Sequence, residues 1–182
     1  MKKSSMRWAY KTLILSISLS IVFSIVSQSM FPNLPIAISV FVIVFFIFVS
    51  VIFDMVAVSV TSIELEKLES LKEEKCFDTV KRLFLNREKV SSFCGDVVGD
   101  ICGILSGAGG VSLVLNMHLQ GEDVVFLVTC LVSSLIAGLT IFGKAIMKAY
   151  SVTNCDKVVL CAAKILQISP FAIFKRRKKD KK

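Results

Sequence analysis

The sequence is poor in the residues on which most hydrolytic and metal-dependent enzymes rely. Its one histidine, His118, stands alone, and a lone loop histidine is more often solvated than bound to a metal. There is no HExxH motif, no G-x-S-x-G motif and no glycine-rich phosphate loop after a strand. The long apolar segments hold no histidine that could activate a serine or a cysteine. These absences predict that the protein is not an enzyme and binds no organic cofactor.

Paired cysteines are lacking as well. The six cysteines include no CxxC pair, so neither a zinc site nor a thioredoxin-like redox motif is expected from them. They stand at positions 76, 94, 102, 130, 155 and 161. All but the first fall in apolar or amphipathic stretches, which is typical of small, reduced core residues. The net charge is +8, but the charges are clustered, so nucleic acid is not an expected partner.

Apolar residues are what the sequence has in excess. They make up 54% of its 182 residues and give a mean hydropathy of +0.74, more apolar surface than a soluble domain of this size could bury. Crossing a bilayer takes about 20 mostly apolar residues. Four stretches qualify as spans: Thr12–Met30, Leu34–Val60, Val90–Leu115 and Val124–Ala149. The first span precedes no A-x-A-like cleavage site, so we expect it to be retained, with the lipid bilayer as the first partner.

Basic residues are absent from two of the loops, and this predicts the orientation. The loops Phe31–Asn33 and Asn116–Asp123 hold no lysine or arginine. All 22 basic residues precede the first span, lie between the second and third, or follow from Lys144 onward. Because loops rich in lysine and arginine stay inside, we expect a multi-pass protein of the cytoplasmic (plasma) membrane with both termini in the cytoplasm.

The segments outside the spans also show helical patterns. Residues 61–89 place apolar residues at helical spacing among charges, which predicts a cytoplasmic helical hairpin. Residues 154–168 predict a juxtamembrane amphipathic helix that ends before Pro170. A basic N-terminus (1–11) and a basic tail (171–182) flank the transmembrane domain (12–170). The expected fold is an all-α integral membrane protein with four transmembrane helices.

The third span carries the most informative pattern. Four glycines recur four residues apart along it, at Gly95, Gly99, Gly103 and Gly107. This spacing predicts a helix face on which another backbone can approach closely. Asp96 and Asp100 repeat at the same interval on the adjacent face. At 1.5 Å per residue, Asp100 lies about 15 Å from the inner end of the span, near the bilayer midplane.

An aspartate at that depth costs about 2.5–3.5 kcal/mol on insertion scales unless it is paired, protonated or bound to a cation. Hard cations such as magnesium prefer carboxylate, carbonyl and water oxygens. The run 106–110 is a poor helix former, and unwinding it would free carbonyls to line a cavity. The sequence therefore predicts a midplane site for a divalent cation, with magnesium the expected ion. The candidate ligands are Asp100, Asp96, Ser92, Gly99 and Asp54.

Other interpretations stay open at these positions. Asp100 can instead be a protonated or hydrogen-bonded residue that joins helices. Lys144, near the end of the fourth span, can reach the interface with its long side chain or neutralise an aspartate. Asp54 lies near the cytoplasmic boundary of its span, where solvent alone would satisfy it.

Three landmarks occur in order between Ile52 and Pro170. FDMVAVSVTS (53–62) ends the second span, a Ser-Ser pair (91–92) and Gly-Asp (99–100) lie in the third, and GLTIFGK (138–144) ends the fourth. With the amphipathic helix and Ser-Pro that follow, this stretch resembles the transmembrane domain of the cyclin M (CNNM) / CorB–CorC magnesium transporter family. The order of spans also agrees, with one extra N-terminal helix in this chain.

The resemblance implies a magnesium transporter that forms homodimers through this domain. It makes Asp100 the most expected ligand, because an aspartate can ligate where the family uses an amide. The ligand set would be rebuilt, since Ala57 stands in place of the motif glutamate and Thr140 near the place of a second one. Only the basic tail follows Pro170, where the family continues into CBS domains.

Two functions are therefore predicted. The first is transport of a divalent cation, magnesium above all, and it depends on Asp96, Asp100 and the resemblance. The second is a non-transporting membrane partner or regulatory subunit that packs against another membrane protein. Loss of the motif glutamate at Ala57 favours the second.

Overall fold

The structure, a computed structural model, describes residues 3–31, 34–74 and 76–168. Every regular element in this part of the chain is helical. Four helices are long and apolar enough to cross a membrane: Thr12–Met30, Ile36–Ser62, Arg87–Leu115 and Glu122–Thr153. The all-α fold with four candidate membrane spans is thus confirmed, and the predicted ends differ by only a few residues.

The first, second and fourth spans are single helices, α1 (Lys3–Met30), α2 (Ile36–Ser62) and α7 (Glu122–Thr153). Helix α1 begins at Lys3, so residues 3–11, which were predicted as a separate basic N-terminus, form the first turns of the first helix. The predicted basic tail, residues 171–182, lies outside the described residues.

The third span is one continuous rod made of three parts. It consists of α5 (Arg87–Ser91), the π-helical segment η2 (Ser92–Gly99) and α6 (Asp100–Leu115). Hydrogen bonds in a π-helix join residues five apart, so η2 spaces its side chains differently from the α-helices beside it. The run 106–110, a poor helix former that could unwind, is α-helical in the structure. Two of its glycines are buried against neighbouring helices, and this packing offsets their poor helix propensity.

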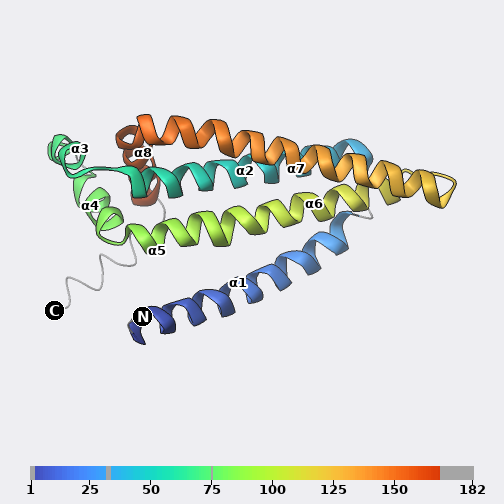
Figure 1. The fold of residues 1–182 in the computed structure, drawn as a ribbon, viewed down its shortest axis with the longest axis horizontal. Helices are drawn as coiled ribbons and strands as arrows, with labels where there is room; N and C mark the ends of the chain where they lie inside the picture. The colour runs from blue at the N-terminus through green and yellow to red at the C-terminus, as the bar shows by residue number, and fades with distance from the viewer. Residues whose placement is uncertain (1–2, 32–33, 75, 169–182) are drawn as a thin grey trace.

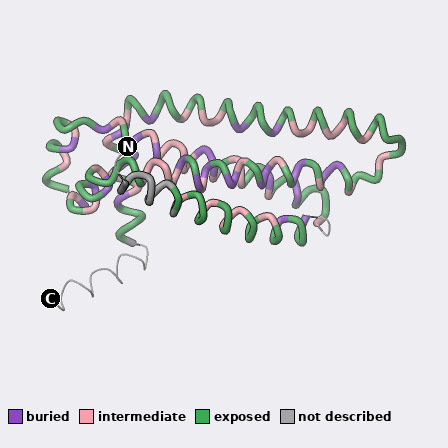
Figure 2. Tube along the Cα trace, turned by 60° about the horizontal axis from the view of Figure 1, so that its bottom comes forward, coloured by how far each residue is buried: buried purple, intermediate pink, exposed green. Residues whose placement is uncertain are grey.

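The central helix of the bundle is α2 (Figure 1). It packs along η2 and α6 and also along α7, and α6 and α7 contact each other. Helix α1 packs against α6 and η2, and it diverges from them toward its first residues. Burial concentrates where α2, η2 and α6 meet, whereas α1 and α7 expose most of their length (Figure 2).

Large apolar side chains cover these exposed surfaces. Phe41, Phe126 and Ile141 are examples, with 71%, 72% and 68% of each residue exposed. Soluble monomers rarely leave apolar patches of such breadth uncovered, whereas in a bilayer these side chains would meet lipid tails. Length, hydropathy and exposure together describe a multi-pass membrane protein.

A second core lies at the end of the bundle where α1 begins. Three short helices gather there, α3 (Leu65–Ser70), α4 (Phe77–Leu85) and α8 (Cys155–Ile168) (Figure 1). We call it the α4–α8 core; its fully buried members are Val60, Val80, Cys155, Val159 and Ala163. The predicted hairpin is thus two short helices, of which α4 packs against α8, the predicted juxtamembrane helix.

Candidate functional site

Three pairs of consecutive residues, each from a different helix, meet within the bundle. Ser50–Val51 lies midway along α2, Gly99–Asp100 joins η2 to α6, and Gly143–Lys144 belongs to α7. The first two of the contacts that follow depend on a glycine, and the third is an ion pair. Together they bring the two oppositely charged side chains of the region side by side.

The first contact joins η2 to α2 through Gly99. The buried hydroxyl of Ser50 donates a hydrogen bond of 2.6 Å to the Gly99 carbonyl oxygen. A Cβ added at Gly99 would lie 3.3 Å from the carbonyl oxygen of Cys94 and 3.6 Å from that of Ser50. Because Gly99 has no side chain, the backbones of η2 and α2 can approach closely. The Ser50 hydroxyl gives the Gly99 carbonyl a hydrogen bond that lipid tails could not provide.

The second contact joins α7 to α2 through Gly143. A Cβ added there would lie 2.8 Å from Cγ2 of Val51, closer than packed carbon atoms come. Because Val51 directly follows Ser50, α7 and η2 are drawn to adjacent positions on α2. Lys144 directly follows Gly143, so this approach also sets the position of its side chain.

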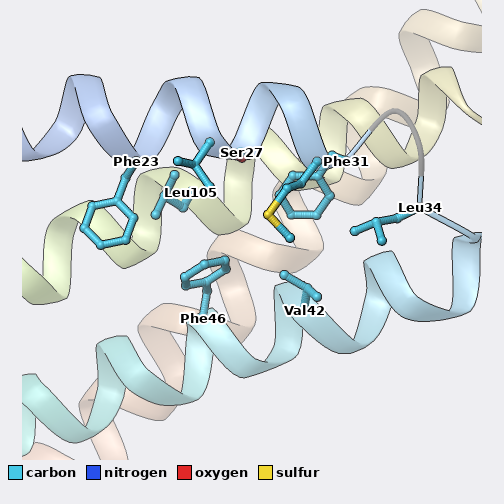
Figure 3. A pocket seen from close by; sticks show the side chains of 9 residues that line it. Phe23, Ser27, Phe31, Leu34, Val42, Phe46 and Leu105 are labelled. Carbon is cyan, nitrogen blue, oxygen red and sulfur yellow. The ribbon is translucent and has the colours of Figure 1, made fainter.

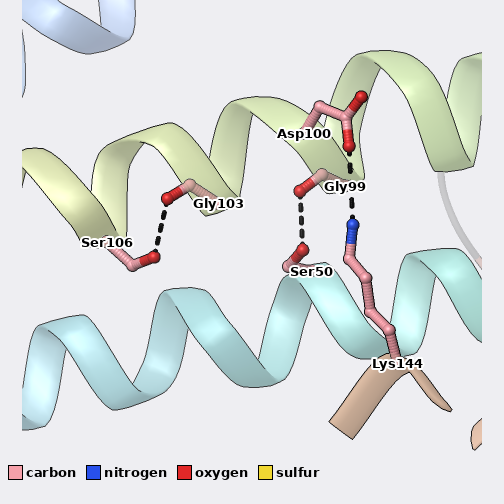
Figure 4. Close-up of polar contacts among 6 residues, drawn as sticks. All are labelled: Ser50, Gly99, Asp100, Gly103, Ser106 and Lys144. Atoms are coloured by element: carbon pink, nitrogen blue, oxygen red, sulfur yellow. Dashed lines mark hydrogen bonds and ion pairs between the residues drawn. The ribbon is translucent and has the colours of Figure 1, made fainter. Parts of the chain in front are cut away.

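The third contact is an ion pair between the helices so placed (Figure 4). Nζ of Lys144 lies 3.4 Å from Oδ1 of Asp100. The lysine side chain is 25% exposed, whereas the aspartate side chain is 64% exposed. The carboxylate therefore projects from the side of the bundle, where a bilayer would surround it. Of the open interpretations of Lys144, the structure favours the one in which it neutralises an aspartate.

The other predicted ligands do not gather around Asp100. Asp96 is exposed on η2, and Ser92 is half-buried at the start of that segment. Asp54 of α2 is half-buried beside Gly95, with its Oδ1 3.7 Å from where a Cβ would lie. In the part of the chain that the structure describes, no three His, Cys, Asp or Glu residues are grouped to hold a metal ion. A magnesium site built from fewer side chains and from carbonyl oxygens stays a prediction.

The four glycines of the predicted face differ in their surroundings. Gly95 and Gly99 do lie against other groups, whereas a Cβ at Gly103 or Gly107 would meet nothing within 4 Å. The close approaches in α6 are instead at Gly109, against Phe31, and at Gly110, against Ile136. The reason is η2: its wider winding breaks the every-fourth-residue register that the sequence pattern assumes.

A small cavity lies apart from this site, between α1, α2 and α6 (Figure 3). Its volume is about 110 Å³, and its walls include Phe23, Phe31, Val42, Phe46 and Leu105. Ser27 is the one polar residue among those that line it. This cavity therefore offers a cation almost no ligand.

Comparison with known proteins adds no relative: no family model, no curated protein and no solved structure matches this chain. The resemblance to the magnesium transporters therefore stays a prediction from the motifs.

Proposed function

We propose that this protein is a subunit of a membrane assembly in which another transmembrane helix covers the outer face of η2 and α6. The observation that carries the proposal is the 64% exposure of the Asp100 side chain near the middle of an apolar span. Charged side chains in spans almost always face the bundle interior or a water-filled cavity, not lipid tails. A partner helix would shield Asp100 from lipid tails.

The same face is suited to helix packing. Asp96, Asp100 and Ile104 are exposed along it, and Gly103 and Gly107 leave open space beside them. Small residues four apart let a second helix approach closely, and packing of this kind drives helix association in lipid. The open glycines thus support a partner here, whereas Gly109 and Gly110 are already covered.

A second copy of the chain, giving a homodimer, is the partner that the charges favour. Acidic Asp96 and Asp100 on η2–α6 are matched by basic Lys144 and Lys148 on the antiparallel α7. Both pairs are four residues apart, so acids and bases occupy similar depths. Two copies inserted in the same direction keep those depths. Because Asp100 and Lys144 pair within each copy, a two-fold axis would leave Asp96 of one copy to meet Lys148 of the other.

Replacing Gly107 with leucine is expected to abolish this association while leaving the bundle folded, because the new side chain fills open space on the docking face. Energy transfer between donor-labelled and acceptor-labelled copies in lipid vesicles measures the association. Gly138→Leu, on the exposed face of α7 with nothing within 4 Å, is the matched control and should assemble normally. Unchanged energy transfer in Gly107→Leu would remove this face from the proposal.

We also propose that the membrane is the cytoplasmic one and that the α4–α8 core lies in the cytoplasm. The basic residues near α1, α4, α5 and α8 support this orientation. Cys161 is exposed on α8 and provides a direct test. A membrane-impermeant thiol reagent should label it in opened membranes but not in intact cells, and labelling in intact cells would reverse the orientation.

Transport of a divalent cation, magnesium above all, is the second candidate. It is supported by the π-helical winding of η2, which is frequent at functional sites, and by the two aspartates on either side of the η2–α6 junction. On this proposal Lys144 must leave Asp100 when the ion arrives.

Calorimetric titration of magnesium into the detergent-solubilised protein tests the second candidate. We expect binding to the native chain and a loss of at least tenfold in affinity in Asp100→Asn, followed by magnesium flux in vesicles. Equal binding by both proteins, or none by either, would leave Asp100 without a role in transport.

A further inference from the structure

Basic side chains gather where the chain enters the third span, at the turn between α4 and α5. Residues 81–89, which we call the α4–α5 corner, hold four basic residues and a single acid, Glu88. The four basic residues are all exposed: Lys81, Arg82, Arg87 and Lys89. We infer that this corner binds the headgroup of an anionic phospholipid. The inference depends on neither proposed function.

The positive charges of the corner are not neutralised within the described part of the chain. The ion pairs found there all lie elsewhere, at Lys72, Lys144 and Lys164. Glu88 is itself exposed and forms an ion pair with none of the four basic side chains. A group of like charges without internal partners creates a positive potential at the surface, which attracts an anionic ligand.

The length of the third span places this corner among the headgroups. The span Arg87–Leu115 has 29 residues and is at most about 43 Å long, whereas the hydrocarbon core is about 30 Å thick. Its last five residues, 111–115, are apolar except for Ser112, whereas its first three include Arg87 and Lys89. The excess length therefore lies at the α5 end, where the polar headgroup layer continues beyond the hydrocarbon.

An exposed leucine shares the basic face of α4. Val80 and Leu83 turn into the α4–α8 core, so Lys81, Arg82 and Leu85 lie on the opposite face of the helix. Leu85 is 70% exposed. Leucine beside lysine and arginine is typical of helices at a membrane surface, where the apolar side chain enters the acyl region and the charges stay among the headgroups. An acidic protein would satisfy the charges but would not account for the leucine.

The two arginines of the corner are suited to a phosphate group. A planar guanidinium can donate to two phosphate oxygens at once. Cζ of Arg87 lies 5.3 Å from the centre of the Phe84 ring, a stacked position that limits the freedom of its side chain. Nδ2 of Asn86 donates a hydrogen bond of 3.0 Å to the Arg82 carbonyl oxygen, which stabilises the turn between the two arginines. Arg82 and Arg87 are therefore the expected phosphate ligands.

Native mass spectrometry of the detergent-solubilised chain, titrated with phosphatidylglycerol and separately with phosphatidylcholine, tests the inference. We expect the native chain to bind phosphatidylglycerol at least tenfold more tightly, and the double variant Arg82→Gln with Arg87→Gln to lose most of this preference. The matched control is Lys72→Gln with Lys157→Gln. It removes the same charge from exposed positions at the same end of the bundle and should keep the preference.

Equal affinities of the native chain for the two lipids would overturn the inference. A preference that survives in the arginine variant, or that falls equally in the control, would also overturn it, because the lipid would then respond to the overall charge of this end. A polyglutamate peptide that binds the native chain but not the arginine variant, without any lipid preference, would assign the corner to an acidic protein instead. Lys81→Gln with Lys89→Gln is the second variant if the arginine variant does not fold, and the same criteria apply to it.

Discussion

Replacing Lys144 with methionine is expected to destabilise the bundle by about 2–3 kcal/mol, close to the cost of an unpaired aspartate within a span. The reason is geometric. The Asp100 side chain is too short to reach the interface from the middle of its span, so it would keep an unpaired carboxylate in lipid. Asp100→Asn should cost much less, because the freed lysine can extend toward the headgroups.

Unfolding in mixed micelles of increasing SDS content measures both single variants and the double variant. The double variant should recover most of the loss, since it leaves no unpaired charge. Equal losses in the two single variants, or additive losses in the double variant, would mean that the two side chains do not interact in the membrane.

Gly143→Leu is expected to destabilise the bundle by about 1–3 kcal/mol, because the new side chain must displace Val51 and push α7 away from α2. The ion pair should be lost in the same variant, since Gly143 positions Lys144. Destabilisation should therefore be accompanied by the loss of coupling between Asp100 and Lys144 in a double-mutant cycle.

The matched control lies on the same helix. Gly138 has nothing within 4 Å of where its Cβ would be, so Gly138→Leu should change stability by no more than about 0.5 kcal/mol. If Gly143→Leu proved as harmless as Gly138→Leu in the same unfolding experiment, the close contact of α7 with α2 would not form.

The spans were predictable because the bilayer imposes a length and an apolar character on each of them. The pattern of basic residues similarly anticipated that α1 begins at the end of the bundle that holds α4 and α8. Both signals are averages over many residues and tolerate local irregularity. The juxtamembrane helix is a further example, predicted at 154–168 and found at Cys155–Ile168.

The contacts between helices were less predictable, because they depend on single residues and on register. Gly143 has no partner glycine four residues away, so no repeat distinguished it from the exposed Gly138. No sequence pattern indicated the π-helical segment η2. If the whole span were α-helical, the four-residue repeat would place Gly103 and Gly107 on the same face as Gly95 and Gly99. The ion pair itself was only one of two alternatives, since a lysine at that depth can equally reach the interface.

The α4–α8 core also has a consequence for how the chain matures. Its members come from both sides of the last two spans: Val80 is synthesised before them, whereas Val159 and Ala163 follow them. As the ribosome works from the N-terminus, α4 emerges long before α8 does, and its apolar side remains uncovered during that interval. Completion of this core is therefore a late event in biogenesis. Truncation before residue 155 would remove α8 and leave exposed apolar side chains, which chaperones and proteases recognise.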